Sequence, residues 1–511
     1  MKRQAIIDIG SEAITLTIAE LSKDSYRIIE RVMGNLSLGS DCYINSQISE
    51  ESINRLIDIL SSFKDKCYKE YKVRDLLVFA SSALREAGNR DLILCKIKYK
   101  LDLNIKILSN TDERIFNLAY VRDNCLKNDE FTSMDLKLIE LGAGSLQLSS
   151  LINNDVEFSE NIKLGTLRVA SLYNSLYDAK KSKSLIISHI TQEMSVFANT
   201  HKIDKETRAI IPLFYSAHLS YLLSLIGIKD NKGYHRLSIK EFEKIESKAK
   251  KISDLDLSVI YKVPAELVVV IRSTLLIMRA IINIYDSQEL LFCSADLAVA
   301  YFSYCQSLMN KDTLEQYEKD LMKQIIYLKN CFSYQSQHGD NVRKIALALH
   351  EGLRRVFKLT DKDKQILILA SELHDIGKVI SSVDHAIYSS QLMAKILPYG
   401  LGDSDFELCK NVVANHSGDE RLDIVSYDNL KFSERFRYLI LLSILRIADA
   451  LDASGQGVIS IKNVRIRKSK LELTVSYLSE RKPYFELHTL KKKSKMFSDL
   501  CDLEVDIIEE K

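Results

Sequence analysis

Residues 4–21 read QAIIDIGSEAITLTIAEL, and residues 136–151 read LKLIELGAGSLQLSSL. In each stretch an apolar run reaches an acidic residue, then a turn containing Gly and Ser, and then a second run. The runs have the apolar and β-branched composition of strands, and the Gly-Ser segments have that of tight turns. The sequence therefore predicts two strand–turn–strand units, with Asp8 and Glu140 near the ends of their first strands.

The two turns carry residue types that suit phosphate binding. Glycine lets a backbone approach a phosphate closely, and a serine hydroxyl adds a donor. A carboxylate at a strand end can hold a divalent metal through oxygen. A single motif of this kind is more often an ordinary hairpin turn. Because the motif occurs twice, it favours a nucleotide or phosphate cleft between two domains.

The elements around the two turns predict a repeated α/β organisation. A helix over 51–70 that starts from a Ser49–Glu50 cap, a strand running into a loop over 76–83, and a strand over 105–108 follow the first turn. The second turn then restarts the pattern. From 312 to 452 nearly every segment has helical spacing, and strand-like segments follow. We expect two similar α/β domains, an all-α domain and a small α/β domain. Their expected ranges are 1–122, 123–308, 309–456 and 457–511.

The composition argues against several classes of protein. The 511 residues carry a net charge of +2, which gives no global attraction to nucleic acid or to an anionic membrane. The nine cysteines are scattered without a C-x-x-C pair, which is typical of free thiols in a reducing compartment. The apolar stretch 267–284 contains Arg272 and Arg279, so we expect a buried helix there. We expect a cytoplasmic protein with no membrane partner and no sequence-specific nucleic-acid partner.

The helical region contains an ordered series of histidines and aspartates. Imidazole nitrogens with carboxylate oxygens suit divalent ions, with Mg or Mn expected here and Fe, Co or Zn also compatible. Asp375, which is adjacent to His374, is the natural bridging ligand if two ions bind. A water activated there becomes a nucleophile near neutral pH. Lys378 is expected over the same site, with a solvated helix-end charge as the alternative, whereas His350 is expected to be an ordinary core histidine. The candidate metal ligands are His338, His374, Asp375, His385, His416 and Asp449.

The order of these residues resembles the H…HD…H…H…D pattern of HD-domain phosphohydrolases, and the whole chain resembles a second family. DIGSEA (8–13), ASSALREAGN (80–89) and SNTDERIF (109–116) are similar to motifs of the exopolyphosphatase/guanosine pentaphosphate phosphohydrolase (Ppx/GppA) family. IELGAGSLQL (139–148), KLGTLR (163–168) and LHTLKKKSKMF (487–497) follow in the family's order. The resemblance implies two actin/sugar-kinase-like (ribonuclease H-like) domains, hydrolysis of phosphoanhydride bonds, and a homodimer.

The chain departs from that family where the resemblance places its acids. The family's catalytic acid falls on Thr111, and a second acid falls on Gln147. Neither side chain serves as a general base near neutral pH. Asp112 or Glu113 can substitute after a shift of one or two residues, and Glu140 remains as a candidate catalytic acid. The phosphate-binding candidates implied by the resemblance are Asp8, Gly10, Ser11, Arg85, Gly142, Gly144 and Ser145.

These observations predict a phosphohydrolase acting on polyphosphate or a phosphorylated nucleotide. The candidate catalytic residues are Asp375 and Lys378 at the HD site, which is expected to be the more competent site, and Glu140 in the front cleft. A regulatory protein, whose front cleft binds a phosphorylated signal without turnover, is the alternative, and exopolyphosphatase activity in the front cleft is a third interpretation. The basic run 491–495, in an expected helix over 490–498, is either a solvated face or a polyanion contact.

Overall fold

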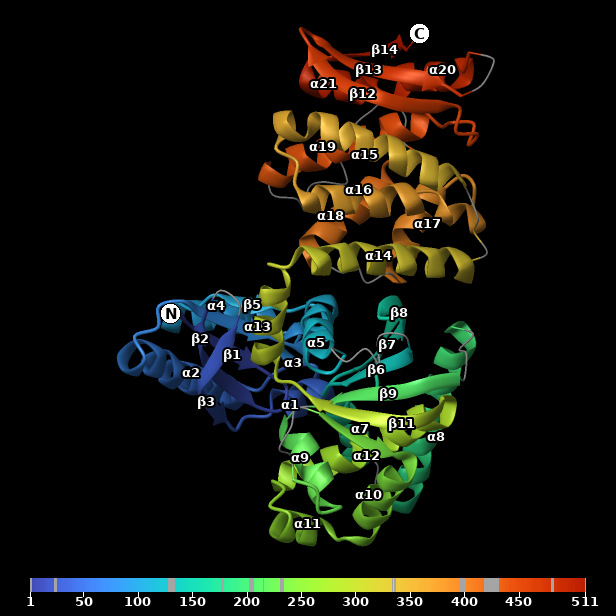
Figure 1. The fold of residues 1–511 in the computed structure, drawn as a ribbon. Coiled ribbons are helices and arrows are strands. Elements are labelled where there is room, and N and C mark those ends of the chain that lie inside the picture. The colour runs from blue at the N-terminus through green and yellow to red at the C-terminus, as the bar shows by residue number, and fades with distance from the viewer. Residues whose placement is uncertain are drawn as a thin grey trace. The chain divides into compact units, whose positions relative to one another are not determined.

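The structure is a computed structural model, and it divides the chain into two compact units, Met1–Gln316 and Tyr317–Lys511 (Figure 1). Each unit is described by itself. The described residues are 2–22, 25–126, 134–175, 179–201, 206–214, 216–229, 234–332, 334, 337–395, 401–417, 432–478 and 482–510.

The first sheet of unit 1 has the strand order β3-β2-β1-β4-β5. Its first three strands are antiparallel neighbours in sequence, and β4 and β5 then add in parallel to β1. The last five residues of β1 are all buried, as expected for a strand between two neighbours and under helices. The strands are β1 (Lys2–Ile9), β2 (Ile14–Leu21), β3 (Tyr26–Gly34), β4 (Leu76–Ala80) and β5 (Ile105–Ile107).

The second sheet of unit 1 repeats this arrangement. Its order is β10-β11-β9-β6-β7-β8, in which β6, β7 and β8 are antiparallel and β9 and β11 add in parallel to β6. The predicted internal repeat is thus a repeat of topology, with β10 as an extra antiparallel edge strand. The strands are β6 (Asp135–Leu141), β7 (Leu146–Ile152), β8 (Asp155–Ile162), β9 (Glu206–Phe214), β10 (Tyr234–Ser238) and β11 (Asp286–Ser294).

Helices accompany the strands of both sheets. The helix predicted from Ser49 is α2, whose N-cap serine accepts a hydrogen bond from the Ser52 amide. The described helices of unit 1 are α1 (Leu38–Asn45), α2 (Glu50–Asp65), η1 (Lys66–Glu70), α3 (Ser82–Glu86), α4 (Arg90–Leu101), α5 (Asn110–Asn124), α7 (Thr166–Ser175), α8 (Ala179–His201), α9 (Ser216–Ser224), α10 (Ile239–Lys251), α11 (Asp254–Ile260), α12 (Ala265–Ile284) and α13 (Leu297–Ser307).

Unit 2 is mainly helical, as the spacing after residue 312 predicts. The helix α15 packs against α16, α19 and the strand β12. The helices that form this part are α14 (Lys311–Cys331), α15 (Gln337–Phe357), α16 (Asp361–Leu373), η2 (Ile376–Val379), α17 (His385–Leu392), η3 (Met393–Lys395), α18 (Asp403–Ala414) and α19 (Phe432–Ala450).

The C-terminal part of unit 2 adds a three-stranded sheet of order β12-β13-β14. One hydrophobic core runs from Leu321 in α14 to Phe497 near the end of the chain, so it is continuous across the boundary expected at 456. The prediction of a single Lys-rich helix over 490–498 is wrong, because the helix is interrupted at Ser494 and the segment forms parts of two helices. The elements are β12 (Ile459–Arg467), β13 (Lys470–Tyr477), α20 (Tyr484–Lys493), α21 (Lys495–Cys501) and β14 (Glu504–Glu509).

Within the described residues, no helix has both the length and the apolar character needed to cross a bilayer. The helix α12, which contains Arg272 and Arg279, is therefore not a candidate span.

Candidate functional site

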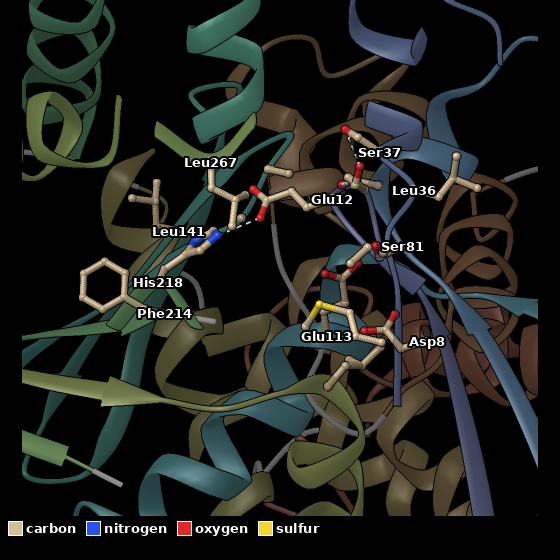
Figure 2. Close-up of a pocket in the computed structure, with 18 of the residues that line it drawn as sticks. Asp8, Glu12, Leu36, Ser37, Ser81, Glu113, Leu141, Phe214, His218 and Leu267 are labelled. Carbon is tan, nitrogen blue, oxygen red and sulfur yellow. Dashed lines mark hydrogen bonds and ion pairs between the residues drawn. The ribbon is translucent and has the colours of Figure 1, made fainter. Parts of the chain in front are cut away.

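A cavity of about 600 Å³ lies in unit 1, where the two Gly-rich hairpins come together. Asp8 and Ser11 line it from the first hairpin, and Glu140, Gly142 and Ser145 line it from the second. Figure 2 shows side chains of both hairpins around the same space. The structure thus brings together most of the residues that the sequence assigns to a phosphate cleft.

The two hairpin turns have matching hydrogen bonds. The Gly10 amide donates to the Ala13 carbonyl at 3.1 Å, and the Gly142 amide donates to the Ser145 carbonyl at 3.0 Å. A Cβ atom on Gly10 would lie 2.8 Å from the Ala13 carbonyl oxygen, which is too close for any side chain. The glycine at this position is therefore required by the turn, and it also leaves the backbone open toward the cavity.

Asp8 and Glu140 are buried acids on the cavity wall. Burial, with Glu113 and Asp296 nearby, raises the pKa of Asp8 to about 8. Burial likewise raises the pKa of Glu140 to about 7, against the opposing influence of Arg114 and Asn117. Among the described residues, Asp8 Oδ1 and Glu140 Oε1 have no hydrogen-bond partner. Buried carboxylate oxygens without a partner are candidates for ion or ligand binding.

The helix α5 contributes Glu113 to the cavity, and not Thr111 or Asp112. Asp112 is occupied in the capping box of α5, where it accepts from the Ser109 amide at 3.2 Å. Glu113 lies one residue further along the helix and forms an ion pair with Arg85 at 2.7 Å. An acid therefore faces the cavity although Thr111 does not, which strengthens the interpretation in which Glu113 substitutes.

Three of the predicted phosphate-binding residues have structural roles. Arg85 is not among the residues that line the cavity, and its guanidinium bonds to Glu113 and, at 2.6 Å, to Asn110. Gly144 lies outside the lining as well. A Cβ at this position would clash with the Tyr43 hydroxyl, so packing requires the glycine. The Ser11 hydroxyl reaches the lining but also accepts from the Ala83 amide at 3.1 Å.

Glu12 and His218 form an ion pair on the cavity wall. His218 Nε2 lies 2.8 Å from Glu12 Oε2, and Figure 2 shows Glu12 extended toward the histidine. Burial disfavours the charged imidazole, but Glu12 raises the pKa of His218 above its usual value. Neither residue was predicted from the sequence as a member of the site. The pair links the first hairpin to α9.

The helical unit brings all six predicted metal ligands into one cluster, called here the His/Asp centre (His338, His374, Asp375, His385, His416 and Asp449). Asp375 lies in the middle. Its Oδ2 is 3.7 Å from His338 Nε2 and 3.8 Å from His374 Nε2, and its Oδ1 is 3.3 Å from His385 Nε2 and 3.6 Å from His416 Nε2. Asp449 Oδ1 completes the first group at 3.1 Å from His338 Nε2.

Backbone carbonyls fix the tautomers of three of these histidines. Nδ1 of His374, His385 and His416 donates to the carbonyls of Ser371, Ser382 and Val413 at 2.8, 3.0 and 2.7 Å. A carbonyl only accepts, so each Nδ1 carries the proton and each neutral ring presents a bare Nε2.

The Nε2 atoms of these three histidines and of His338 face one another at short range. His385 Nε2 and His416 Nε2 are 3.3 Å apart, and His374 Nε2 and His338 Nε2 are 3.2 Å apart. Burial lowers the pKa of His416 to about 4, which keeps that ring neutral. The unprotonated Nε2 atoms of His385 and His416, held this close, are stabilised by a cation between or beside them, so these side chains fit a divalent ion.

Two further side chains belong to the centre and were not predicted. Asp452 Oδ2 lies 2.8 Å from His338 Nδ1 and orients that ring, as a carboxylate behind a metal-binding histidine does. The Lys493 ammonium contacts Asp449 Oδ2, and the predicted Lys378 contacts Asp375 Oδ2. Asp452 follows Asp449 by three residues at the end of α19, so helical spacing was the signal that pointed to it.

The fold and the sites define an actin-like α/β protein with a helical C-terminal part. The model of the Ppx/GppA phosphatase family matches residues 17–298, and that of Ppx/GppA phosphatase domain III matches residues 322–495. The chain therefore belongs to the Ppx/GppA phosphatase family. The match of domain III covers the His/Asp centre, whose assignment to the HD type stays a prediction.

Several curated proteins are similar to parts of the chain. The bifunctional 3-dehydroquinate synthase/phosphatase of Fusobacterium nucleatum is 26% identical over 34% of this chain and 27% of its own. Exopolyphosphatase 1 of Mycobacterium leprae is 22% identical over 33% of this chain and 48% of its own. The chain thus spans less than half of these two relatives. The guanosine-5'-triphosphate,3'-diphosphate pyrophosphatase of Photobacterium profundum is 20% identical over 75% of both chains.

Solved structures support the fold. An exopolyphosphatase from Cytophaga hutchinsonii matches with a TM-score of 0.51 and 14% identity, over 60% of this chain and 98% of that one. The Aquifex aeolicus member of the Ppx/GppA family matches with a TM-score of 0.50 and 19% identity, over 60% of this chain and 99% of that one. At these identities the likeness concerns the fold alone.

Proposed function

We propose that this protein is a divalent-metal-dependent phosphohydrolase whose His/Asp centre is its more competent site. The observation that carries the proposal is the orientation of the imidazoles. Three of them are fixed by carbonyls so that their unprotonated Nε2 atoms converge on Asp375. An arrangement that holds bare nitrogens and carboxylates together without protons between them is suited to cations.

The centre offers two ligand groups that share Asp375. One group has His338, His374 and Asp449, whose ligand atoms all lie within 4.8 Å of one another, with Asp375 Oδ2 beside the two imidazoles. The other group has His385 and His416 with Asp375 Oδ1. Divalent ions bound there would supply Lewis acidity and activate water near neutral pH. Lys378, about half exposed and in contact with Asp375, is suited to bind a substrate phosphate.

The substrate class is a phosphoanhydride or phosphoester of polyphosphate or of a phosphorylated nucleotide. Membership of the Ppx/GppA phosphatase family supports this class, and relatives named exopolyphosphatase and guanosine-5'-triphosphate,3'-diphosphate pyrophosphatase are consistent with it. In this mechanism the carboxylates of the centre would hold the ions, and Lys378 together with the ions would orient the phosphate and oppose its charge.

The cavity of unit 1 is the second candidate site. The observation in its favour is Glu113, which faces the cavity beside Asp8 and Glu140. Among the described lining residues Arg55 is the one lysine or arginine, and it is exposed at the rim. A cavity with so many acids would need a divalent ion to bind a phosphate, and Asp8 and Glu140 are its candidate ligands. Glu113 would then act as general base.

Two isosteric variants separate the candidates. Turnover of polyphosphate, guanosine tetra- and pentaphosphate, deoxynucleotides, 2′,3′-cyclic nucleotides and an aryl phosphate is measured with Mn or Mg. Asp375→Asn should lower turnover of the best substrate on the order of a hundredfold or more, because it removes the shared ligand. Glu113→Gln should leave that turnover nearly unchanged.

Asp384→Asn is the matched control, because Asp384 is exposed next to His385 and outside the centre. Circular dichroism checks that each variant is folded, and elemental analysis gives the metal content. If folded Asp375→Asn keeps wild-type turnover while Glu113→Gln loses it, the chemistry belongs to the unit 1 cavity and the proposal for the His/Asp centre is wrong.

A further inference from the structure

Lys493 differs from the other lysines of the C-terminal basic run. Lys491, Lys492 and Lys495 are exposed, whereas the side chain of Lys493 is only 25% exposed. On α20, Lys493 follows the buried Glu486 and Leu490 at helical spacing, so it lies on the face that packs inward. Because α20 packs against α19, this face turns Lys493 toward the end of α19, where Asp449 lies.

The Asp449 carboxylate has two different neighbours. Its Oδ1 faces His338 Nε2 at 3.1 Å and His374 Nε2 at 3.7 Å, and its Oδ2 contacts the Lys493 ammonium. An ion held by the first oxygen therefore does not require the lysine to leave the second. Among the described residues, Asp449 is the one partner of this ammonium, which has three N–H donors.

The charges of the centre favour an anion once it is loaded with metal. Three carboxylates, Asp375, Asp449 and Asp452, are opposed by Lys378 and Lys493. With neutral histidines, even one divalent ion makes the sum positive, and a second makes it more so. The Lys493 side chain keeps 25% of its surface exposed, so a ligand from solvent can reach it while it contacts Asp449.

We propose that Lys493 binds a phosphate group of the substrate at the His/Asp centre, together with Lys378. The C-terminal helix α20 thereby supplies part of the site. The inference rests on the proposed function and narrows its substrate class to molecules with a phosphate whose non-bridging oxygens are free to accept from two ammonium groups. Inorganic phosphate and pyrophosphate are the simplest such anions.

The test compares anion binding and metal content in matched variants. Lys493→Met keeps the apolar stem and removes the charge, Lys492→Met is the control in the same run, and Lys493→Arg restores a cation. Each full-length protein is reconstituted with Mn and titrated calorimetrically with inorganic phosphate and pyrophosphate. Lys493→Met should bind both anions at least about tenfold more weakly at unchanged Mn stoichiometry. Lys492→Met should equal wild type, and Lys493→Arg should recover most of the affinity.

The contrary outcomes are distinct. If Lys493→Met carries its Mn and binds phosphate as wild type does, Lys493 is only a counter-charge for Asp449 and the inference is wrong, although the proposed function stands. If wild type binds no Mn after reconstitution, the proposed function itself fails. If Lys493→Met does not fold, Lys493→Gln replaces it, and wild-type anion affinity in that variant has the same meaning.

Discussion

At the scale of single residues, Asp8 shows what a buried acid at a site costs in stability. Its pKa rises to about 8 when the protein folds, so the folded state binds its proton more tightly than the unfolded state does. Stability from this group is therefore full below about pH 4 and is lost as the pH rises through 8. Asp8→Asn should raise the free energy of unfolding at pH 8.5, by up to roughly 5 kcal/mol, and change it little near pH 4.

Urea unfolding at several pH values, with chelator present to remove metal, measures this difference. Asp58→Asn is the control, because Asp58 is exposed on α2 and makes the same change of charge. If Asp8→Asn is no more stable than wild type at pH 8.5, the folded protein does not disfavour the charged Asp8 carboxylate, and the prediction is wrong.

The residues of the sites were predictable to different degrees. His374 and Asp375 are adjacent, and their partners follow in a recognisable order, so the six ligands of the His/Asp centre needed no tertiary information. Glu113 was only an alternative to Thr111, since a helix phase error of two residues changes which side chain faces a cavity. Lys493 was hidden in a basic run, because partners distant in sequence decide which lysine of a run is buried.

At the scale of elements, the contact between η2 and α17 positions the second ligand group. Gly377 in η2 lies so close to α17 that a Cβ would be 2.1 Å from the His385 carbonyl oxygen and 2.5 Å from the Ser389 amide. Gly377→Ala should therefore push α17 away and lower the free energy of unfolding by about 1–3 kcal/mol. It should also weaken the binding of an ion by His385 and His416. Urea unfolding and Mn content per chain measure the two effects.

Gly402→Ala is the matched control, because a Cβ at that position meets no atom within 4 Å. It should leave both stability and Mn content close to wild type. Equal stability of the two alanine variants would mean that η2 and α17 separate at no cost, and that the close contact does not hold His385 in place.

Elements with strong local signals were predicted, and the edge strand β3 was not. The strand β1 and the helix α2 were found from apolar runs and from the Ser49 cap. The strand β3 alternates between partly buried and exposed residues at the sheet edge, and its charged side chains concealed it. The break at Ser494 was missed because the helix propensity of the lysines on both sides continues across it.

At the scale of the whole molecule, unit 2 has the properties of an independent folding unit. Its hydrophobic core begins in α14 and ends in α21 without a gap at the expected boundary. All members of the His/Asp centre lie within unit 2. A fragment of residues 317–511 should unfold in one cooperative transition and carry the same Mn per mole as the full chain. Thermal unfolding followed by circular dichroism, with elemental analysis, checks both statements.

A fragment of residues 1–316 is the complementary control. It contains the unit 1 cavity, and by the proposed function it should retain little turnover. A fragment 317–511 that lacks a cooperative transition would mean that its core depends on unit 1. The regulatory interpretation stays a prediction. If the fragment 317–511 turns over substrate by itself, that interpretation can apply only to unit 1, whose cavity would bind a phosphorylated signal without turnover.

The repeat was the part of the whole molecule that the sequence predicted best. The second Gly-rich turn signalled that the strand pattern begins again, and the two sheets do share the order of three antiparallel and two parallel strands. The continuous core of unit 2 could not be predicted, since the change from helices to strands near 457 has the same composition whether or not two domains meet there.

The ion pair between Glu12 and His218 has a consequence for the history of the family. The two side chains lie 206 positions apart in the sequence, yet the partly buried Glu12 is the acid that raises the pKa of the buried His218. Loss of the acid alone removes the charge that opposes the burial of the imidazole, which is a cost that selection acts against. The two positions should therefore have changed together, so lineages without an acid at the first should also lack a histidine at the second.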